Sequence, residues 1–243
     1  MKQYPEKLLD RSQANLKLKK TQNDVFNPFD LPLYVASLSL FPDSITCPGS
    51  KAAGCMDPCL KETGNGAIYP EVNEARKRKT QFFHEQKDDF LKLLKHELNL
   101  HDQHAKRTNR KAVVRLNVIS DIDFENYGIP QAFPDTFFYD YTKRAARLTK
   151  PLPDNYQLMF SYSGRPQYRN QVLKAWKTGV PVAVVFRGPM PAEFLNRRVI
   201  NGDKSDLRNV YAKNCIVGLS AKGPAKKDDS GFVVDTGIIA RAA

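Results

Sequence analysis

Three of the four cysteines lie within one short segment, residues 47–59, which is rich in glycine and proline. Their spacing is C-x7-C-x3-C, which matches neither the paired CxxC of a zinc ribbon nor the C-x2-C-x2-C of a ferredoxin. Thiolates are the preferred ligands of soft metals and of iron–sulfur clusters, and glycine and proline let the backbone bend tightly around such a centre. The segment therefore predicts a metal or cluster site held by Cys47, Cys55 and Cys59.

Two other interpretations of this cysteine loop are weaker. A disulfide would leave an odd thiol in the loop, and no signal peptide places the chain in an oxidising compartment. Free cysteines are often buried as small hydrophobic residues, but Lys51, Asp57 and Lys61 make this loop polar. Asp57 and Pro58 also suit the start of a short helix, which would place Cys59 at the positive helix end, where a thiolate is stabilised.

The composition bounds the class of protein. The chain has 243 residues, 41% of them hydrophobic, which is enough for one large domain or two small ones with a full core. No apolar run is long enough to cross a bilayer, and the N-terminus lacks the apolar core of a signal peptide, so we expect a soluble cytoplasmic protein without membrane contact. The formal charge of +12 favours nucleic acid or another polyanion as a partner, although a basic surface alone also explains it.

The pattern along the chain predicts two regions. Residues 1–30 are polar, contain Lys17, Lys19 and Lys20, and are expected to form an extended basic arm, while residues 31–243 form a single α/β domain. Helical spacing of apolar residues predicts helix from 72 to 100, with a second helix starting at Asp88, and another helix over 169–177. Runs of β-favouring residues predict strands over 33–40, 112–119, 136–142, 156–162, 181–186, 214–220 and 231–234.

Strands that alternate with helical segments and are apolar almost throughout indicate a mainly parallel sheet covered on both faces. We expect a partial or distorted (β/α) barrel, in which functional groups collect on the loops that follow the carboxyl ends of strands. Besides the cysteine loop, four side chains occupy such positions: Asp121, Lys143, Ser163 and Arg187. Asp121 is the candidate proton acceptor and Lys143 the candidate partner for an anion.

Two later features leave alternatives open. Cys215 begins the strand predicted over 214–220, where it can serve as a fourth ligand or as a buried structural cysteine. Residues 199–208 are acidic and turn-rich, and we expect a solvated loop there rather than a cation site.

Ordered short motifs along residues 33–235 resemble a known family. They are Ser-Leu-Ser-Leu ahead of Cys-Pro-Gly-Ser, Cys-x3-Cys-Leu, Val-Arg-Leu-Asn-Val with Ser-Asp-Ile, Phe-Tyr-Asp-Tyr-Thr-Lys, and Gly-Leu-Ser-Ala-Lys-Gly with Ser-Gly-Phe-Val-Val. The chain resembles the phage protein family catalogued as gene product eighty-eight. The resemblance implies a bacteriophage origin and hence the host cytoplasm, and it implies no activity.

A cysteine-rich loop after the first strand of a partial barrel is also distantly similar to the radical S-adenosylmethionine superfamily. There, C-x3-C-x2-C binds a 4Fe-4S cluster and the methionine moiety occupies the open iron, so the similarity implies Cys47, Cys55 and Cys59 as cluster ligands. This sequence departs in its cysteine spacing, and the turn at 120–123 is Ser-Asp-Ile-Asp rather than a glycine-rich segment. An iron–sulfur cluster is therefore better supported than S-adenosylmethionine.

The sequence predicts an iron–sulfur protein whose three cysteines hold a cluster for redox, radical or Lewis-acid chemistry. A 4Fe-4S cluster is the favoured type. Nucleic acid or a nucleotide is a candidate substrate. The alternative is a zinc-stabilised basic nucleic-acid-binding protein without catalytic activity.

Overall fold

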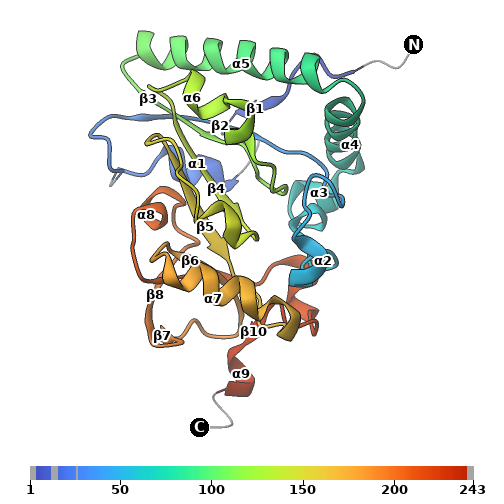
Figure 1. Ribbon diagram of the computed structural model, residues 1–243, viewed down its shortest axis with the longest axis vertical. Helices are drawn as coiled ribbons and strands as arrows, with labels where there is room; N and C mark the ends of the chain where they lie inside the picture. The colour runs from blue at the N-terminus through green and yellow to red at the C-terminus, as the bar shows by residue number, and fades with distance from the viewer. Residues whose placement is uncertain (1–3, 12–15, 26, 240–243) are drawn as a thin grey trace.

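A single large sheet forms the centre of the molecule (Figure 1). The computed structural model describes residues 4–11, 16–25 and 27–239. Within them, ten strands form a sheet in the order β1-β2-β3-β4-β5-β6-β9-β8-β7, with β10 paired to β6. The expected α/β class with a mainly parallel sheet is confirmed.

The strands are β1 (Leu9–Arg11), β2 (Leu33–Leu38), β3 (Lys111–Arg115), β4 (Phe137–Thr142), β5 (Tyr156–Ser161), β6 (Val182–Arg187), β7 (Glu193–Phe194), β8 (Arg197–Asn201), β9 (Ile216–Ser220) and β10 (Val234–Asp235). The α-helices are α1 (Leu16–Gln22), α2 (Ser50–Ala53), α3 (Asn65–Ile68), α4 (Pro70–Glu85), α5 (Lys87–Arg107), α6 (Ile129–Ala132), α7 (Arg169–Lys177), α8 (Leu207–Val210) and α9 (Thr236–Ile239). Short 3-10 turns are η2 (Leu60–Glu62), η3 (Phe124–Tyr127), η4 (Ala145–Arg147), η5 (Pro166–Tyr168) and η6 (Gly223–Lys227).

Strands β2, β3, β4, β5, β6 and β9 are parallel neighbours in the order in which they occur along the chain. Parallel strands need crossover connections, and right-handed crossovers between sequential neighbours place the connecting helices on one face of the sheet. The outer strands β1 and β7 are antiparallel to their neighbours and, among the described residues, are not paired with each other. The sheet is therefore open rather than closed into a barrel.

The long helices α4 and α5 cover the face near β2 and β3, and α7 lies toward the β6 end (Figure 1). Phe83, Phe90, Leu94 and Leu98 form the apolar stripe that predicted this helical region, and all four side chains are buried against the sheet. A separate cluster on the sheet, which includes Leu18 of α1 together with Leu207 and Val210 of α8, fills the opposite face. Both faces are covered, as the apolar strands predict.

The N-terminal segment differs from the extended arm that we expected. Residues 1–3, 12–15 and 26 lie outside the described residues, but β1 pairs with β2 and the side chain of Leu8 is fully buried. Glu97 accepts hydrogen bonds of 2.7 Å from the backbone N–H groups of both Leu8 and Leu9. Lys79 donates to the Leu8 carbonyl at 2.7 Å and pairs with Asp10. The described part of the segment is thus a packed edge of the domain.

The acidic region 199–208 also differs from the solvated loop that we expected. It contains the end of β8, which joins the sheet beside β9, and the fully buried side chain of Asp206. A buried carboxylate needs partners, and the neighbouring strands supply them, as described below.

Candidate functional site

A cavity of about 190 Å³ opens at the carboxyl ends of the parallel strands. Its wall comes from β3, β4, β5, β6 and β9, and from the loops that follow β2, β3, β4 and β9. In an open parallel sheet this edge is where ligands bind, because the loops that follow the strands converge there. Twenty-two residues line the cavity, and the ones that bear on its chemistry are Cys47, Cys55, Cys59, Arg115, Asn117, Asp121, Tyr141, Lys143, Ser161, Asp203, Lys222 and Phe232.

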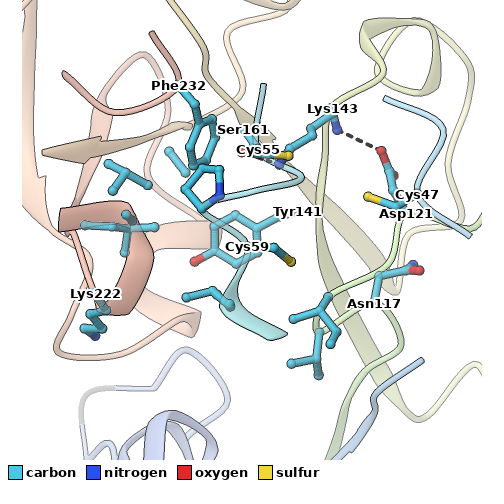
Figure 2. Close-up of a pocket in the computed structure, with 18 of the residues that line it drawn as sticks. Cys47, Cys55, Cys59, Asn117, Asp121, Tyr141, Lys143, Ser161, Lys222 and Phe232 are labelled. Atoms are coloured by element: carbon cyan, nitrogen blue, oxygen red, sulfur yellow. Dashed lines mark hydrogen bonds between the residues drawn. The ribbon is translucent and has the colours of Figure 1, made fainter. Parts of the chain in front are cut away.

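The three cysteines of the loop all line this cavity. Figure 2 shows their sulfur atoms on different sides of the same space, with Cys55 beside the Lys143 side chain and Cys47 near Asp121. Cys47 and Cys55 are each 8% exposed, while Cys59 is half-buried. All three are free thiols. The structure thus brings the three predicted ligands to one cavity, and their binding of a metal or cluster stays a prediction.

Backbone hydrogen bonds fix the cysteine loop locally. The Cys47 carbonyl accepts from both the N–H and the hydroxyl of Ser50, and the Cys55 N–H donates to the Ser50 carbonyl at 3.1 Å. Between them helix α2 ends at Ala53 and is capped by Gly54, whose φ of 72° is a left-handed conformation that favours glycine. The 3-10 turn η2 starts at Leu60 with Cys59 as its N-cap, so the turn that we expected near Asp57 begins slightly later.

Burial keeps the thiols of Cys47 and Cys59 protonated near neutral pH. It raises the pKa of Cys47 to about 12, against a smaller lowering by Lys143. Burial also raises the pKa of Cys59, while a hydrogen bond from the Lys61 backbone lowers it. Burial disfavours the charged form of a thiol, so forming a thiolate here requires a compensating positive charge.

Lys143 brings such a charge into the cavity. Its ammonium donates a 3.0 Å hydrogen bond to Ser161 Oγ and lies 5.3 Å from the centre of the Phe232 ring. Burial lowers the pKa of Lys143, but the negative charge of thiolate forms of Cys55 and Cys47, followed by Asp121, outweighs it and raises the pKa overall. Lys143 is therefore a cation within the electrostatic reach of the cysteine sulfurs.

Asp121, the expected proton acceptor, is held by other groups. Its carboxylate accepts from the Lys143 backbone N–H at 2.9 Å and from Arg147 Nη1 at 2.7 Å, and it lies 3.6 Å from Arg144 Nε. Its side chain is 3% exposed. Although Asp121 lines the cavity, these contacts make it a residue that positions Lys143.

A second buried carboxylate shapes the turn that carries Asp121. Asp140 accepts from the backbone N–H and the side-chain amide of Asn117, at 2.6 and 3.0 Å, and from the Tyr156 hydroxyl. The Asn117 side chain in turn bonds Ser120 and the backbone of Ile122. Burial raises the pKa of Asp140 to about 6, despite the lowering by the bond from Tyr156.

A third network reaches the cavity through Arg115 and Tyr141, which line it, and extends to Asp206 and Tyr139, which do not. Asp206 accepts from the hydroxyls of Tyr141 and Tyr139 at 2.7 and 3.3 Å, and it pairs with Arg115 at 3.2 Å. The Arg115 guanidinium stacks over the Tyr141 ring at 4.6 Å. Sequence reasoning missed these residues, because each is an ordinary strand residue until the register brings it beside Asp206.

The remaining predicted site residues lie elsewhere. Ser163 is buried and donates to the Ala53 carbonyl, which ties the cysteine loop to β5, and Arg187 pairs with Asp235 at 2.7 Å. Neither residue lines the cavity. Cys215 lies just before β9, in the core cluster on the opposite face. The start of a parallel strand is the far end from this cavity, so the structure does not bring Cys215 to the other three cysteines.

Within the described residues, no three His, Cys, Asp or Glu side chains stand close enough together to hold a metal ion in their present conformation. The cysteines share a cavity, but their sulfur atoms have not converged on one point. A centre held by all three would need them to draw inward.

Comparison with known proteins identifies the family. A family model described as Gene product 88 matches residues 7–236, nearly the whole chain. The chain belongs to the Gene product 88 family. No curated protein and no solved structure matches it, so the family assignment brings no activity with it, and similarity to radical S-adenosylmethionine proteins is not shown. Among the described residues, no helix has both the length and the apolar character needed to span a bilayer.

Proposed function

We propose that this member of the Gene product 88 family binds an iron–sulfur cluster, 4Fe-4S first among the types, through Cys47, Cys55 and Cys59. One observation carries the proposal: three free thiols from one loop line a single cavity at the carboxyl edge of a parallel sheet, beside the half-buried cation Lys143. The sequential order of the parallel strands also supports the partial (β/α) barrel that we expected, with the cysteine loop following its first parallel strand.

The donor set fits a soft centre. Thiolate sulfur is the ligand that iron–sulfur clusters and zinc share, and the cavity offers three such donors. Each sulfur can move by rotation about a single side-chain torsion, which changes the distances between the three sulfurs without a change in the backbone. The adjacent Lys143 offsets the negative charge that thiolate ligands bring.

Because Cys47 and Cys59 are protonated near neutral pH, binding must displace protons from them. The affinity for metal should therefore fall as the pH is lowered. When bound through three protein ligands, a 4Fe-4S cluster supplies one open iron for redox, radical or Lewis-acid chemistry. The residues of this chain exclude water with apolar walls such as Phe232 and hold Lys143 next to the reactive space.

The experiment is anaerobic reconstitution with iron and sulfide, followed by visible absorption, electron paramagnetic resonance and analysis of iron and sulfide content. We expect the spectrum of a cluster in the wild-type protein and its loss when Cys47, Cys55 or Cys59 is changed to serine. Cys215→Ser is the matched control, because this thiol is on the opposite face, and it should load normally. A colourless, iron-free wild-type protein, or equal loss in Cys215→Ser, would refute the proposal.

Zinc is the second candidate for the same thiols, within a basic nucleic-acid-binding protein. The formal charge of +12 favours this alternative. However, the basic block at the start of α4 is not all available: Lys79 is buried against Leu8 and Asp10, and Arg76 donates to Asn73. Stoichiometric zinc in the purified protein, with salt-sensitive binding to DNA or RNA, would favour this alternative over a cluster.

A further inference from the structure

The fixed position of Lys143 is the starting point. Its backbone N–H donates to Asp121 at 2.9 Å, and its carbonyl accepts from the Tyr168 hydroxyl at 2.6 Å. A Cβ atom added to Gly49 would lie 2.8 Å from the Lys143 Cβ, so the cysteine loop also packs closely on the base of this side chain. The lysine is held from three sides and its ammonium is directed into the cavity, beside Cys55 (Figure 2).

The carboxylates near the cavity are engaged with other cations. Asp121 pairs with Arg147, and Asp206 with Arg115. Asp203 pairs with Lys222 at 3.0 Å and also accepts from the Ser220 backbone. Within the part of the chain that the structure describes, Lys143 makes no salt bridge, and its hydrogen-bond partner is the neutral hydroxyl of Ser161. An ammonium has three donors, so Lys143 retains donor capacity toward the cavity.

The rest of the lining is largely apolar. Phe232 stands over the Lys143 ammonium, and Val185 and Leu219 face the same space from β6 and β9. A cavity of about 150 Å³ is large enough to bind benzene, and this one is larger, at about 190 Å³. Lys143 is half-buried against these apolar walls, so an anion that reaches its ammonium is held in a partly desolvated place. Because the lysine is already held in position, it binds that anion with little further ordering.

We propose that the cavity binds a small organic acid, with a carboxylate or phosphate group on Lys143 and Ser161 and an apolar body against Phe232, Val185 and Leu219. The acid would be the substrate of the proposed cluster, and only this role as a substrate rests on the proposed function. Binding of the acid depends on the lysine and the apolar wall, so it is expected in metal-free protein as well.

The test uses the full chain, freed of metal and kept reduced, with benzoate, phenyl phosphate and benzyl alcohol as probes at constant ionic strength. By calorimetry we expect one site for an acid and binding of neutral benzyl alcohol weaker by roughly tenfold or more, because a charged hydrogen bond is lost. Lys143→Met should lose a similar factor, whereas Lys143→Arg keeps part of the affinity. Lys226→Met is the control, because Lys226 is an exposed lysine outside the cavity.

A second measurement uses wild-type protein and so does not depend on whether a variant folds. Benzoate or phenyl phosphate should slow modification by a maleimide of Cys59, the more exposed thiol of the cavity, located by mass spectrometry, and benzyl alcohol should not. Absence of both binding and protection, equal affinity in folded Lys143→Met, or equal affinity for benzyl alcohol would overturn the inference. Acid binding without cluster loading would refute the proposed function alone, and loading without acid binding would refute this inference alone.

Discussion

The buried carboxylate of Asp140 should make the stability of the protein depend on pH. Asp140 is fully buried, and its pKa is about 6 in the folded chain against an ordinary value of 3.8. The folded state therefore keeps a proton between pH 4 and 6 that the unfolded chain has released. In that window the contribution of Asp140 to stability falls as the pH rises, and above pH 6 it is constant. Each pH unit is worth about 1.36 kcal/mol, so the total change is about 3 kcal/mol.

The perturbation is Asp140→Asn, which keeps the shape of the side chain and removes the titration. We would measure the free energy of unfolding by urea denaturation from pH 4 to 8 in both proteins. The free energy of unfolding of the variant, relative to that of the wild type, should rise by about 3 kcal/mol as the pH rises through this range. Asp89→Asn on the exposed face of α5 is the control and should show no such trend. A difference between Asp140→Asn and wild type that stays constant with pH would refute the reasoning.

Three other changes test how the site is held. Arg147→Met leaves Asp121 and Glu125 without their buried partner and should cost about 3–5 kcal/mol of unfolding free energy in urea. Gly54→Ala should lower the free energy of unfolding by more than the roughly 1–2 kcal/mol that a left-handed alanine costs, because its Cβ would lie 2.5 Å from the Arg165 side chain. Gly128 is also left-handed but has open space around it, so Gly128→Ala should lower the free energy of unfolding by the cost of the left-handed backbone alone. Glu97→Ala should speed amide hydrogen exchange at β1 while leaving β4 protected, and unchanged exchange at β1 would contradict the role of Glu97.

The fold was predictable where periodicity carried the signal. The strand predicted over 156–162 and the helix over 169–177 agree with β5 and α7 to within a residue. The strand predicted over 112–119 ends earlier, at Arg115, because the Asn117 side chain bonds the backbone of the following turn. β8 was not predicted, because its sequence is polar and its place in the sheet depends on pairing with β9, which is distant in sequence.

The candidate site was predictable as far as topology determines it. Residues that follow parallel strands must meet at one edge, so the cysteine loop, Asp121 and Lys143 were correctly brought together from the sequence. The same rule placed Ser163 and Arg187 there, but it cannot say which way a side chain turns. Ser163 turns to the Ala53 carbonyl and Arg187 to Asp235. The order of the strands along the chain determines which residues lie at this edge of the sheet. The direction in which each side chain points depends on the hydrogen-bond and ion-pair partners around it.

Neighbouring residues change the role that the sequence predicts for Asp121. From the sequence, an acidic residue after a strand is a free carboxylate able to accept a proton. Arg147, supplied by the next crossover, lies 2.7 Å from the Asp121 carboxylate, which also accepts from the Lys143 backbone N–H. Asp121 therefore positions Lys143, and the functional group in the cavity is the lysine. Lys143 is then the cation that the cavity presents to a ligand, and its position is fixed by contacts from three elements that are distant in sequence. A chemical role in this site therefore follows from the balance of neighbouring charges more than from the identity of any one side chain.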